Sequence, residues 1–155
     1  MSFEVRERDV PSQVTIGLER NAAQAIPTAA VTGISWVATP LWNRGFTWAA
    51  GTSITVPESG LYEIKWDVTF VPGAGLVRLT WATLSNDATH RWGQHLHVAH
   101  AATTDLLSSN ATVNIPANVT ITINVFHDAG VNLNIAGASD FQRCECSVTK
   151  IGQFV

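Results

Sequence analysis

The sequence predicts an all-β protein, and more specifically a jelly-roll sandwich, on two observations. From residue 31 onward, apolar and polar residues alternate with the period of a β-strand, and Gly, Pro or Asn interrupts them about every ten residues. About eight or more strands can be read in this way, which is the strand number of a double-sheet jelly roll. No stretch shows a competing helical period. The 155 residues suit a single domain with a substantial core.

The first residues of the chain differ from the rest. They lack the alternation, and the first 20 residues hold seven of the 21 charged residues. We therefore expect residues 1–19 to form an N-terminal arm and residues 20–155 to form the jelly-roll domain. The arm side chains that we expect to bind a partner are Phe3, Val5, Arg6, Arg8 and Val10.

The next segments predict short strands. "VTGISWVAT" (31–39) and "FTWAAGTSITV" (46–56) alternate only briefly, and Gly33, Gly45, Gly51 and Pro40 interrupt or separate them. Glycine inside a strand pattern marks a bulge or a bend, and proline is confined to edges. We expect these strands to lie near a sheet edge or corner.

"GLYEIKWDVTFV" (60–71) is the clearest strand. Its aromatic and aliphatic residues from Tyr62 to Phe70 alternate with charged or polar ones, which predicts one face in the core and one in water. In "LVRLTWATLSN" (76–86), the pattern predicts Val77, Leu79 and Trp81 on one side. Of the six tryptophans, Trp66 and Trp81 are the expected core residues.

Two further strands are predicted in "VNIPANVTITINVFHDAGVNLNI" (113–135), with turns at 116–118 and 128–130. The expected inward row of the middle strand is Val119, Ile121, Ile123 and Val125.

The last strand, in "DFQRCECSVTKIG" (140–152), alternates Cys144, Cys146 and Val148 with polar residues. The two cysteines would share one strand face with β-carbons roughly 6 to 7 Å apart, too far for a disulfide. We expect reduced, semi-buried thiols.

Composition limits the function classes. Charged residues make up 14% of the chain, against about 25% in typical domains, and the formal net charge is −3. The sequence contains no cluster of Lys and Arg of the kind that binds nucleic acid. No apolar run reaches the ~18 residues that a membrane span needs, and "MSFEVRERDV" lacks the apolar core of a secretory signal. A surface with so few charges has little to keep copies of the chain apart, which favours a surface covered by other subunits. The alternative is a small monomer whose surface is polar rather than charged.

The segment "HRWGQHLHVAH" (90–100) holds four of the five histidines. His95 and His97 would share a strand face, a spacing known from zinc and copper sites, but no nearby carboxylate completes a site, so the prediction is no metal. The favoured interpretation of this segment is a polar strand or loop beside an interface, and a metal site is the alternative to it. Trp42 and Trp92, in irregular polar segments, are together with His95 and His97 the candidate surface contacts, for a partner or a glycan.

Enzyme signatures are missing from the sequence. There is no G-x-S-x-G elbow, "PGAGLV" is too short for a phosphate loop, and no carboxylate pair stands out, so we expect neither catalysis nor a cofactor. The sequons at Asn110 and Asn118 are chance products of a Thr- and Asn-rich chain, unless the protein is secreted from a eukaryote.

Four segments carry a family resemblance: "NAAQAIPTAAVTGISW", "FTWAAGTSITVPESGLYEIKWDVTF", "NATVNIPANVTITINVFHDAG" and "CECSVTKIG". In order and spacing, the chain over about residues 20–152 resembles the C1q/TNF-like jelly-roll family in the form found in bacteriophage and bacterial surface proteins. The "VPESGLYEI" stretch is the strongest match, since in that family a Pro and a Gly precede the aromatic that opens a long central strand. The resemblance implies a homotrimer and a non-enzymatic role in adhesion, signalling or virion architecture.

These observations predict a bacteriophage virion structural protein, a trimeric jelly roll that decorates the capsid or another part of the particle and docks through its arm. Its partners would be its own copies and other capsid or tail proteins. The alternative is a receptor-binding or carbohydrate-binding head of a tail tip or fibre that contacts a host surface glycan. A secreted cytokine-like or C1q-like ligand, the third reading, predicts an upstream signal that we do not find.

Overall fold

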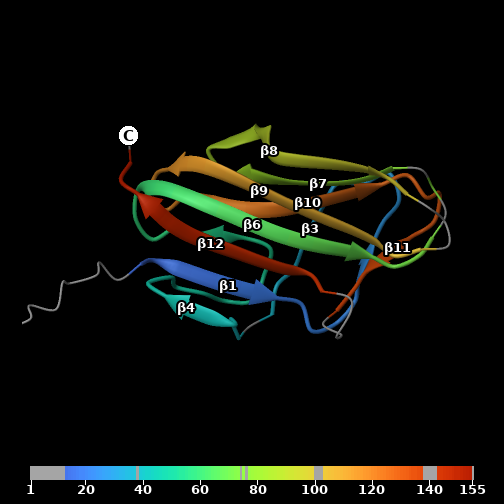
Figure 1. The fold of residues 1–155 in the computed structure, drawn as a ribbon, viewed down its shortest axis with the longest axis horizontal. Helices are drawn as coiled ribbons and strands as arrows, with labels where there is room; N and C mark the ends of the chain where they lie inside the picture. The colour runs from blue at the N-terminus through green and yellow to red at the C-terminus, as the bar shows by residue number, and fades with distance from the viewer. Residues whose placement is uncertain are drawn as a thin grey trace, which may run out of the picture.

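The protein folds into two antiparallel β-sheets packed face to face (Figure 1). The computed structural model describes residues 13–37, 39–73, 75, 77–99, 103–137 and 143–154. No helix occurs among these residues. The prediction of an all-β jelly-roll sandwich is therefore confirmed.

The first sheet, sheet A, is built around the long strand β6, with β9 along one side and β12, β1 and β4 in succession along the other. β11 pairs with the end of β6 and carries β2. The strands of sheet A are β1 (Thr15–Glu19), β2 (Gln24–Ile26), β4 (Trp42–Arg44), β6 (Gly60–Phe70), β9 (Asp105–Ile115), β11 (Leu133–Ile135) and β12 (Glu145–Gly152).

The second sheet, sheet B, has the order β3–β10–β7–β8, with β5 also paired to β10. Its strands are β3 (Thr32–Gly33), β5 (Ile54–Thr55), β7 (Val77–Leu84), β8 (Asp87–Val98) and β10 (Thr120–His127). The chain crosses from sheet A to sheet B after β2, β4, β6 and β9, and it returns after β3, β5, β8 and β10. These repeated crossings give the jelly roll its connectivity.

The core lies between the two sheets, and most of the predicted inward rows fill it. On β6, the side chains of Tyr62, Ile64, Trp66, Val68 and Phe70 are all buried. The predicted row of β10 and the predicted row of β12 are buried as well, and Asn118 occupies the tight turn before β10 with a positive φ of 65°.

One inward row was assigned to the wrong face. On β7 the residues that line the core are Ala82 and Leu84, together with the polar Thr80, and not the predicted row of Val77, Leu79 and Trp81. Trp81 is buried all the same, because the guanidinium of Arg91 lies 4.5 Å from its ring centroid on the outer face of sheet B. The error arose because β7 carries apolar residues on both faces, so alternation alone could not distinguish them.

The predicted arm boundary at residue 19 is also wrong. Residues 15–19 form β1, which pairs with β12 on one side and β4 on the other, and both Ile16 and Leu18 are fully buried. The strand was missed because its five residues "TIGLE" are too few to establish alternation. Residues 1–12, with the predicted contacts Phe3, Val5, Arg6, Arg8 and Val10, lie outside the described residues.

Candidate functional site

A groove of about 390 Å³ crosses the outer face of sheet A. We call it the Trp42 groove. At its base, Ser109, Trp66, Cys146 and Leu18 stand in register on the four neighbouring strands β9, β6, β12 and β1. The residues that flank these four on each strand point outward, because successive side chains of a strand point to opposite faces. The lining residues are Leu18, Leu41, Trp42, Lys65, Trp66, Asp67, Ser108, Ser109, Asn110, Glu145, Cys146 and Ser147.

The indole of Trp42 forms one side of this groove. Trp42 pairs with Gly17 in the sheet, and a β-carbon added at Gly17 would lie 2.4 Å from ring atoms of Trp42, so the indole rests directly on the backbone of β1. Its Nε1 donates a hydrogen bond to the Thr15 hydroxyl at 3.3 Å. The side chain is nevertheless 49% exposed. A fixed indole with an accessible surface is therefore present at this edge.

Polar side chains of opposite charge line the rest of the groove. Lys65 pairs with Glu63 at 2.7 Å, and Glu145 pairs with Arg143 at 3.1 Å. Within the described residues no ion pair joins the carboxylate of Asp67. The groove thus offers one ammonium, two carboxylates and several neutral donors and acceptors.

The histidine segment lies on β8, the edge strand of sheet B, where it meets β9. The ring of His95 forms a hydrogen bond with the Ser108 carbonyl at 2.8 Å, and His97 Nε2 lies 3.1 Å from Asp105 Oδ1. Both rings therefore face β9 and close the edge of the sandwich. Nothing in the sequence indicated the carboxylate of Asp105, which β9 brings to His97. His100 lies outside the described residues.

Trp92 is part of β8 and not of an irregular segment, and the same correction applies to Trp42 on β4. The pairing of β7 and β8 shifts between Ala82–Trp92 and Leu84–Asp87, so β8 bulges there. The ring of His90 stacks on Trp92 with centroids 4.2 Å apart, and Trp92 packs against the core. Both stacking and core packing reduce the surface that Trp92 offers to a partner.

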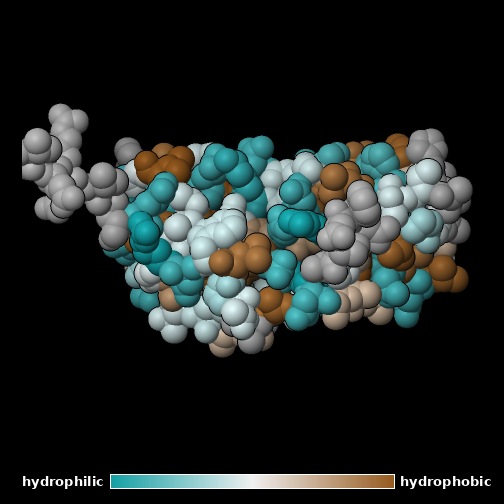
Figure 2. Space-filling view, turned by 60° about the horizontal axis from the view of Figure 1, so that its bottom comes forward, coloured by the Kyte–Doolittle hydropathy of each residue, from teal (hydrophilic) through white to brown (hydrophobic). Residues whose placement is uncertain are grey.

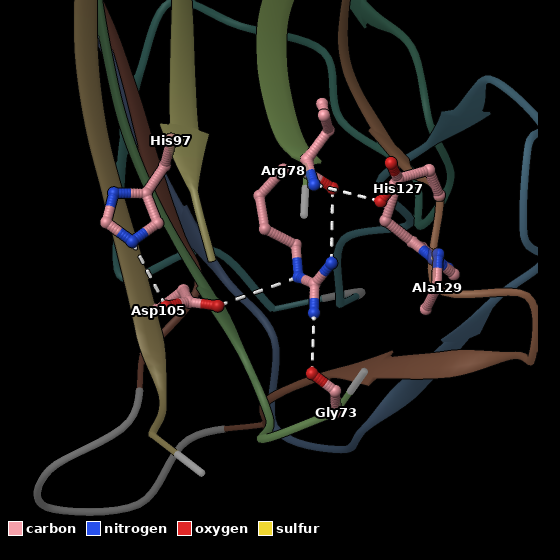
Figure 3. Close-up of polar contacts among 8 residues, drawn as sticks. Gly73, Arg78, His97, Asp105, His127 and Ala129 are labelled. Carbon is pink, nitrogen blue, oxygen red and sulfur yellow. Dashed lines mark hydrogen bonds and ion pairs between the residues drawn. The ribbon is translucent and has the colours of Figure 1, made fainter. Parts of the chain in front are cut away.

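A buried ionic cluster lies where β7, β8 and β9 meet (Figure 3). The Arg78 side chain is fully buried, and its Nε lies 3.6 Å from Oδ2 of the buried Asp105. Its guanidinium also donates to the carbonyl oxygens of Gly73 and Val77 and lies 5.6 Å from the ring centroid of Phe70. These contacts join the ends of β6, β7 and β9 at one end of the sandwich.

His127 lies on β10 beside Arg78, and it too is fully buried. Its Nε2 is 2.8 Å from the Ile26 carbonyl, and its Nδ1 accepts a hydrogen bond from the amide of Ala129 at 3.2 Å. The ring therefore fixes the turn that follows β10. Its partners are backbone groups, which indicates a structural role.

Both thiols are free, as predicted, and they are fully buried rather than semi-buried. Burial raises the pKa of Cys144 from 9.0 to about 11, and burial raises the pKa of Cys146 further still. Neither thiol is poised to act as a nucleophile, because the reactive form is the thiolate.

An apolar row crosses the outer face of sheet B. The register places Leu79 opposite both Leu96 and Phe126, and Val77 opposite Val98. Leu96 and Val98 are 55% and 60% exposed. By contrast, Figure 2, which brings forward the side with β1 and β4, shows hydrophobic residues as separate patches among hydrophilic ones.

The structure separates the four predicted surface contacts. Trp42 lies at the β4 edge of sheet A, whereas Trp92, His95 and His97 lie on β8 of sheet B. The groove residues Lys65, Asp67 and Asn110 were missed as site residues. The alternation in 60–71 places Lys65 and Asp67 on the water-facing side, and the same rule applied to β9 would have added Asn110. In the described part of the chain, no group of three or more His, Cys, Asp or Glu side chains is arranged to hold a metal. The same residues contain no helix long and apolar enough to span a membrane.

The fold is that of the TNF-like jelly rolls. The crystal structure of murine APRIL at pH 5.0 matches with a TM-score of 0.70 and 13% identity, and the one at pH 8.5 matches with a TM-score of 0.66 and 15% identity. Each comparison covers 90% of this chain and 99% of the chain in that crystal structure. Eiger TNF from S. frugiperda matches with a TM-score of 0.68 and 10% identity, over 92% of this chain and 94% of Eiger. No protein-family model and no curated protein sequence matches the chain. At such identities the likeness establishes the C1q/TNF-like fold alone.

Proposed function

We propose that the protein is a non-enzymatic virion structural protein, a homotrimeric jelly roll that decorates the capsid or another part of a bacteriophage particle. The observation that supports self-association is the apolar row of sheet B, in which Leu96 and Val98 are more than half exposed on an edge strand. Apolar side chains placed side by side on a sheet face mark protein–protein contacts. The resemblance of the sequence to the bacteriophage form of the C1q/TNF-like family supports a place on a phage particle.

The role of residues 1–12 in this proposal is docking. They combine apolar and charged side chains, among them Phe3, Arg6 and Arg8, and they precede β1, which begins at Thr15. The sandwich would form the exposed head, and the residues before β1 would join it to other virion proteins.

The mass in solution tests the assembly. The full-length chain is expected at three times the chain mass, and Leu96→Glu combined with Val98→Glu is expected to shift it to the mass of one chain, because a carboxylate buried in an apolar contact is strongly unfavourable. A circular-dichroism spectrum of the variant verifies that it is folded. A single-chain mass for the unmodified protein would contradict the proposal.

Docking is tested separately with purified particles that lack the protein. The full-length chain is expected to bind them at saturation, and the chain without residues 2–12 is expected to remain trimeric but unbound. Full occupancy by the shortened chain would show that the N-terminal residues are not the docking element.

A second function is favoured by the Trp42 groove: a receptor-binding or carbohydrate-binding head at a tail tip or fibre end. An exposed, fixed indole next to several polar groups is typical of surfaces that recognise a partner. Host-cell adsorption separates the two functions, since saturable adsorption by the isolated protein is expected of a head and not of a decoration protein.

A further inference from the structure

We propose that the Trp42 groove binds one sugar ring of a neutral oligosaccharide, with the ring stacked on the accessible surface of the Trp42 indole. This inference rests on the second proposed function, the receptor-binding or carbohydrate-binding head, and names its site and its ligand class. Three properties of the groove support it: a fixed aromatic platform, mixed hydrogen-bonding walls and the balance of charge.

The platform is held in place before any ligand arrives. Gly17 lets the indole rest on the β1 backbone, and the hydrogen bond to Thr15 fixes its orientation. Little conformational entropy remains to be lost when a ligand stacks on it, and such preorganisation increases affinity. An aromatic surface matches the C–H face of a sugar ring, which is the apolar part of that ligand.

The walls match the remaining part of a sugar, its hydroxyl groups. Outward side chains of three neighbouring strands line the groove, with Lys65 and Asp67 from β6, Ser108 and Asn110 from β9, and Glu145 and Ser147 from β12. Carboxylate and amide oxygens accept hydrogen bonds, ammonium and amide groups donate them, and hydroxyls do both. Sugar hydroxyls need both kinds of partner in close succession, and this groove supplies them.

The charge favours a neutral ligand. Lys65, the cation among the residues that line the groove, already pairs with Glu63, while Asp67 and Glu145 contribute two carboxylates. An acidic sugar or a phosphate would bring a further negative charge next to these carboxylates and would be repelled. A volume of about 390 Å³ lies at the low end of the range for ligand pockets, about 300–1,000 Å³, in keeping with one bound sugar ring.

The test is a titration of the ¹⁵N-labelled full-length protein, in which the indole N–H resonance of Trp42 is followed by NMR. The probes are cellotriose, maltotriose and chitotriose, with trigalacturonic acid as the acidic counterpart. We expect at least one neutral trisaccharide to shift the Trp42 resonance saturably. We expect the acidic one to have no effect.

Two variants and one control locate the site. Trp42→Ala removes the platform, and Gly17→Ala keeps the indole but displaces it from the sheet, since the added β-carbon would overlap the ring. Each is expected to weaken binding, measured by calorimetry, by about tenfold or more. Val131→Ala truncates an exposed apolar residue that neither lines the groove nor belongs to the apolar row of sheet B, and it is expected to leave the affinity unchanged.

Any of four results would overturn the proposal: no shift with any of the neutral trisaccharides, equal binding of the acidic one, unchanged affinity in Trp42→Ala, or a changed mass in solution for that variant. The last result would show that the groove is a contact between copies of the chain. If Trp42→Ala still adsorbs to host cells like the unmodified protein, the head function stands and only this site is wrong. If the groove binds sugar but the protein never adsorbs to host cells, the sugar site stands and the head function is wrong.

Discussion

Arg78 is a fully buried cation in a chain that has few charges elsewhere. It is balanced by Asp105 and by the carbonyl oxygens of Gly73 and Val77. Such an arrangement adds little net stability compared with an apolar pair, but it makes the loss of one partner costly, because the other charge stays buried.

Replacing Arg78 alone is therefore expected to be severe. Arg78→Met removes the guanidinium from the buried Asp105 carboxylate, which keeps its contact with His97. The free energy of unfolding is expected to fall by about 3 kcal/mol in urea titrations followed by tryptophan fluorescence. Adding Asp105→Asn is expected to restore part of that loss. Arg91→Met, on the solvent-facing side of Trp81, is the control and is expected to cost less than about 1 kcal/mol. A double variant no more stable than Arg78→Met would contradict the pairing.

The buried thiols make stability depend on alkaline pH. In the unfolded chain they ionise near pH 9, whereas burial raises the pKa of Cys144 to about 11 and that of Cys146 beyond it. Because the folded-state pKa is the higher one, the stabilisation is fully present below pH 9 and is lost as the pH rises through about 11. Cys144 alone accounts for about 2 to 3 kcal/mol.

This is checked by the urea midpoint between pH 8 and pH 11. The midpoint is expected to decrease with rising pH in the unmodified protein. It is expected to decrease less steeply in the double variant Cys144→Ala with Cys146→Ala. Tyr62 adds to the remaining slope from pH 10 upward, because burial and the nearby Glu58 raise its pKa to about 12. Identical slopes in both proteins would show that the thiols do not carry the effect.

At the scale of elements, β1 is an integral strand of sheet A. It lies between β12 and β4, and it buries Ile16 and Leu18 completely. Burying side chains of this size contributes about 1.5 to 3 kcal/mol each, which is a large share of the about 5 to 15 kcal/mol that stabilise a domain. The strand also carries the platform, since Trp42 rests on Gly17.

Two deletions are expected to differ sharply for this reason. Removal of residues 2–12 should leave the thermal transition within a few degrees of that of the full chain. Removal of residues 2–19 eliminates β1 and should give an unfolded or insoluble protein. Circular dichroism and the soluble fraction after expression measure the difference, and a folded product of the longer deletion would contradict the role of β1.

Across the whole molecule, the fold combines a face rich in polar groups with a face that carries an apolar row. The outer face of sheet A holds the Trp42 groove, whereas Val77, Leu79, Leu96 and Val98 lie on the outer face of sheet B. Charged residues are 14% of the sequence, so electrostatic repulsion between copies is weak. Self-association through the apolar row would leave the groove accessible.

An assembly held by apolar contacts should tolerate salt. The mass in solution, at a fixed protein concentration, is expected to stay the same between about 0.05 and about 1 M sodium chloride, because screening weakens charge pairs and not apolar contacts. Dissociation as the salt concentration rises would indicate that ion pairs join the copies. Leu96→Glu combined with Val98→Glu serves as the reference for the dissociated state.

The sequence by itself determined the fold class and the inward rows of β6, β10 and β12. These properties follow from the order of side chains along one strand, because the strand geometry assigns alternate residues to opposite faces. The same rule failed for β7, where both faces carry apolar residues, and for β1, which is too short to show a pattern.

Only the tertiary structure decided which strands are neighbours, and with them the groove and the ionic cluster. Trp42 meets Gly17, Lys65 lies beside Asn110, and Arg78 reaches Asp105 through pairings between strands that are distant in the sequence. Such contacts depend on the register and order of strands in the sheets, which the packing of the entire core fixes and local alternation does not encode.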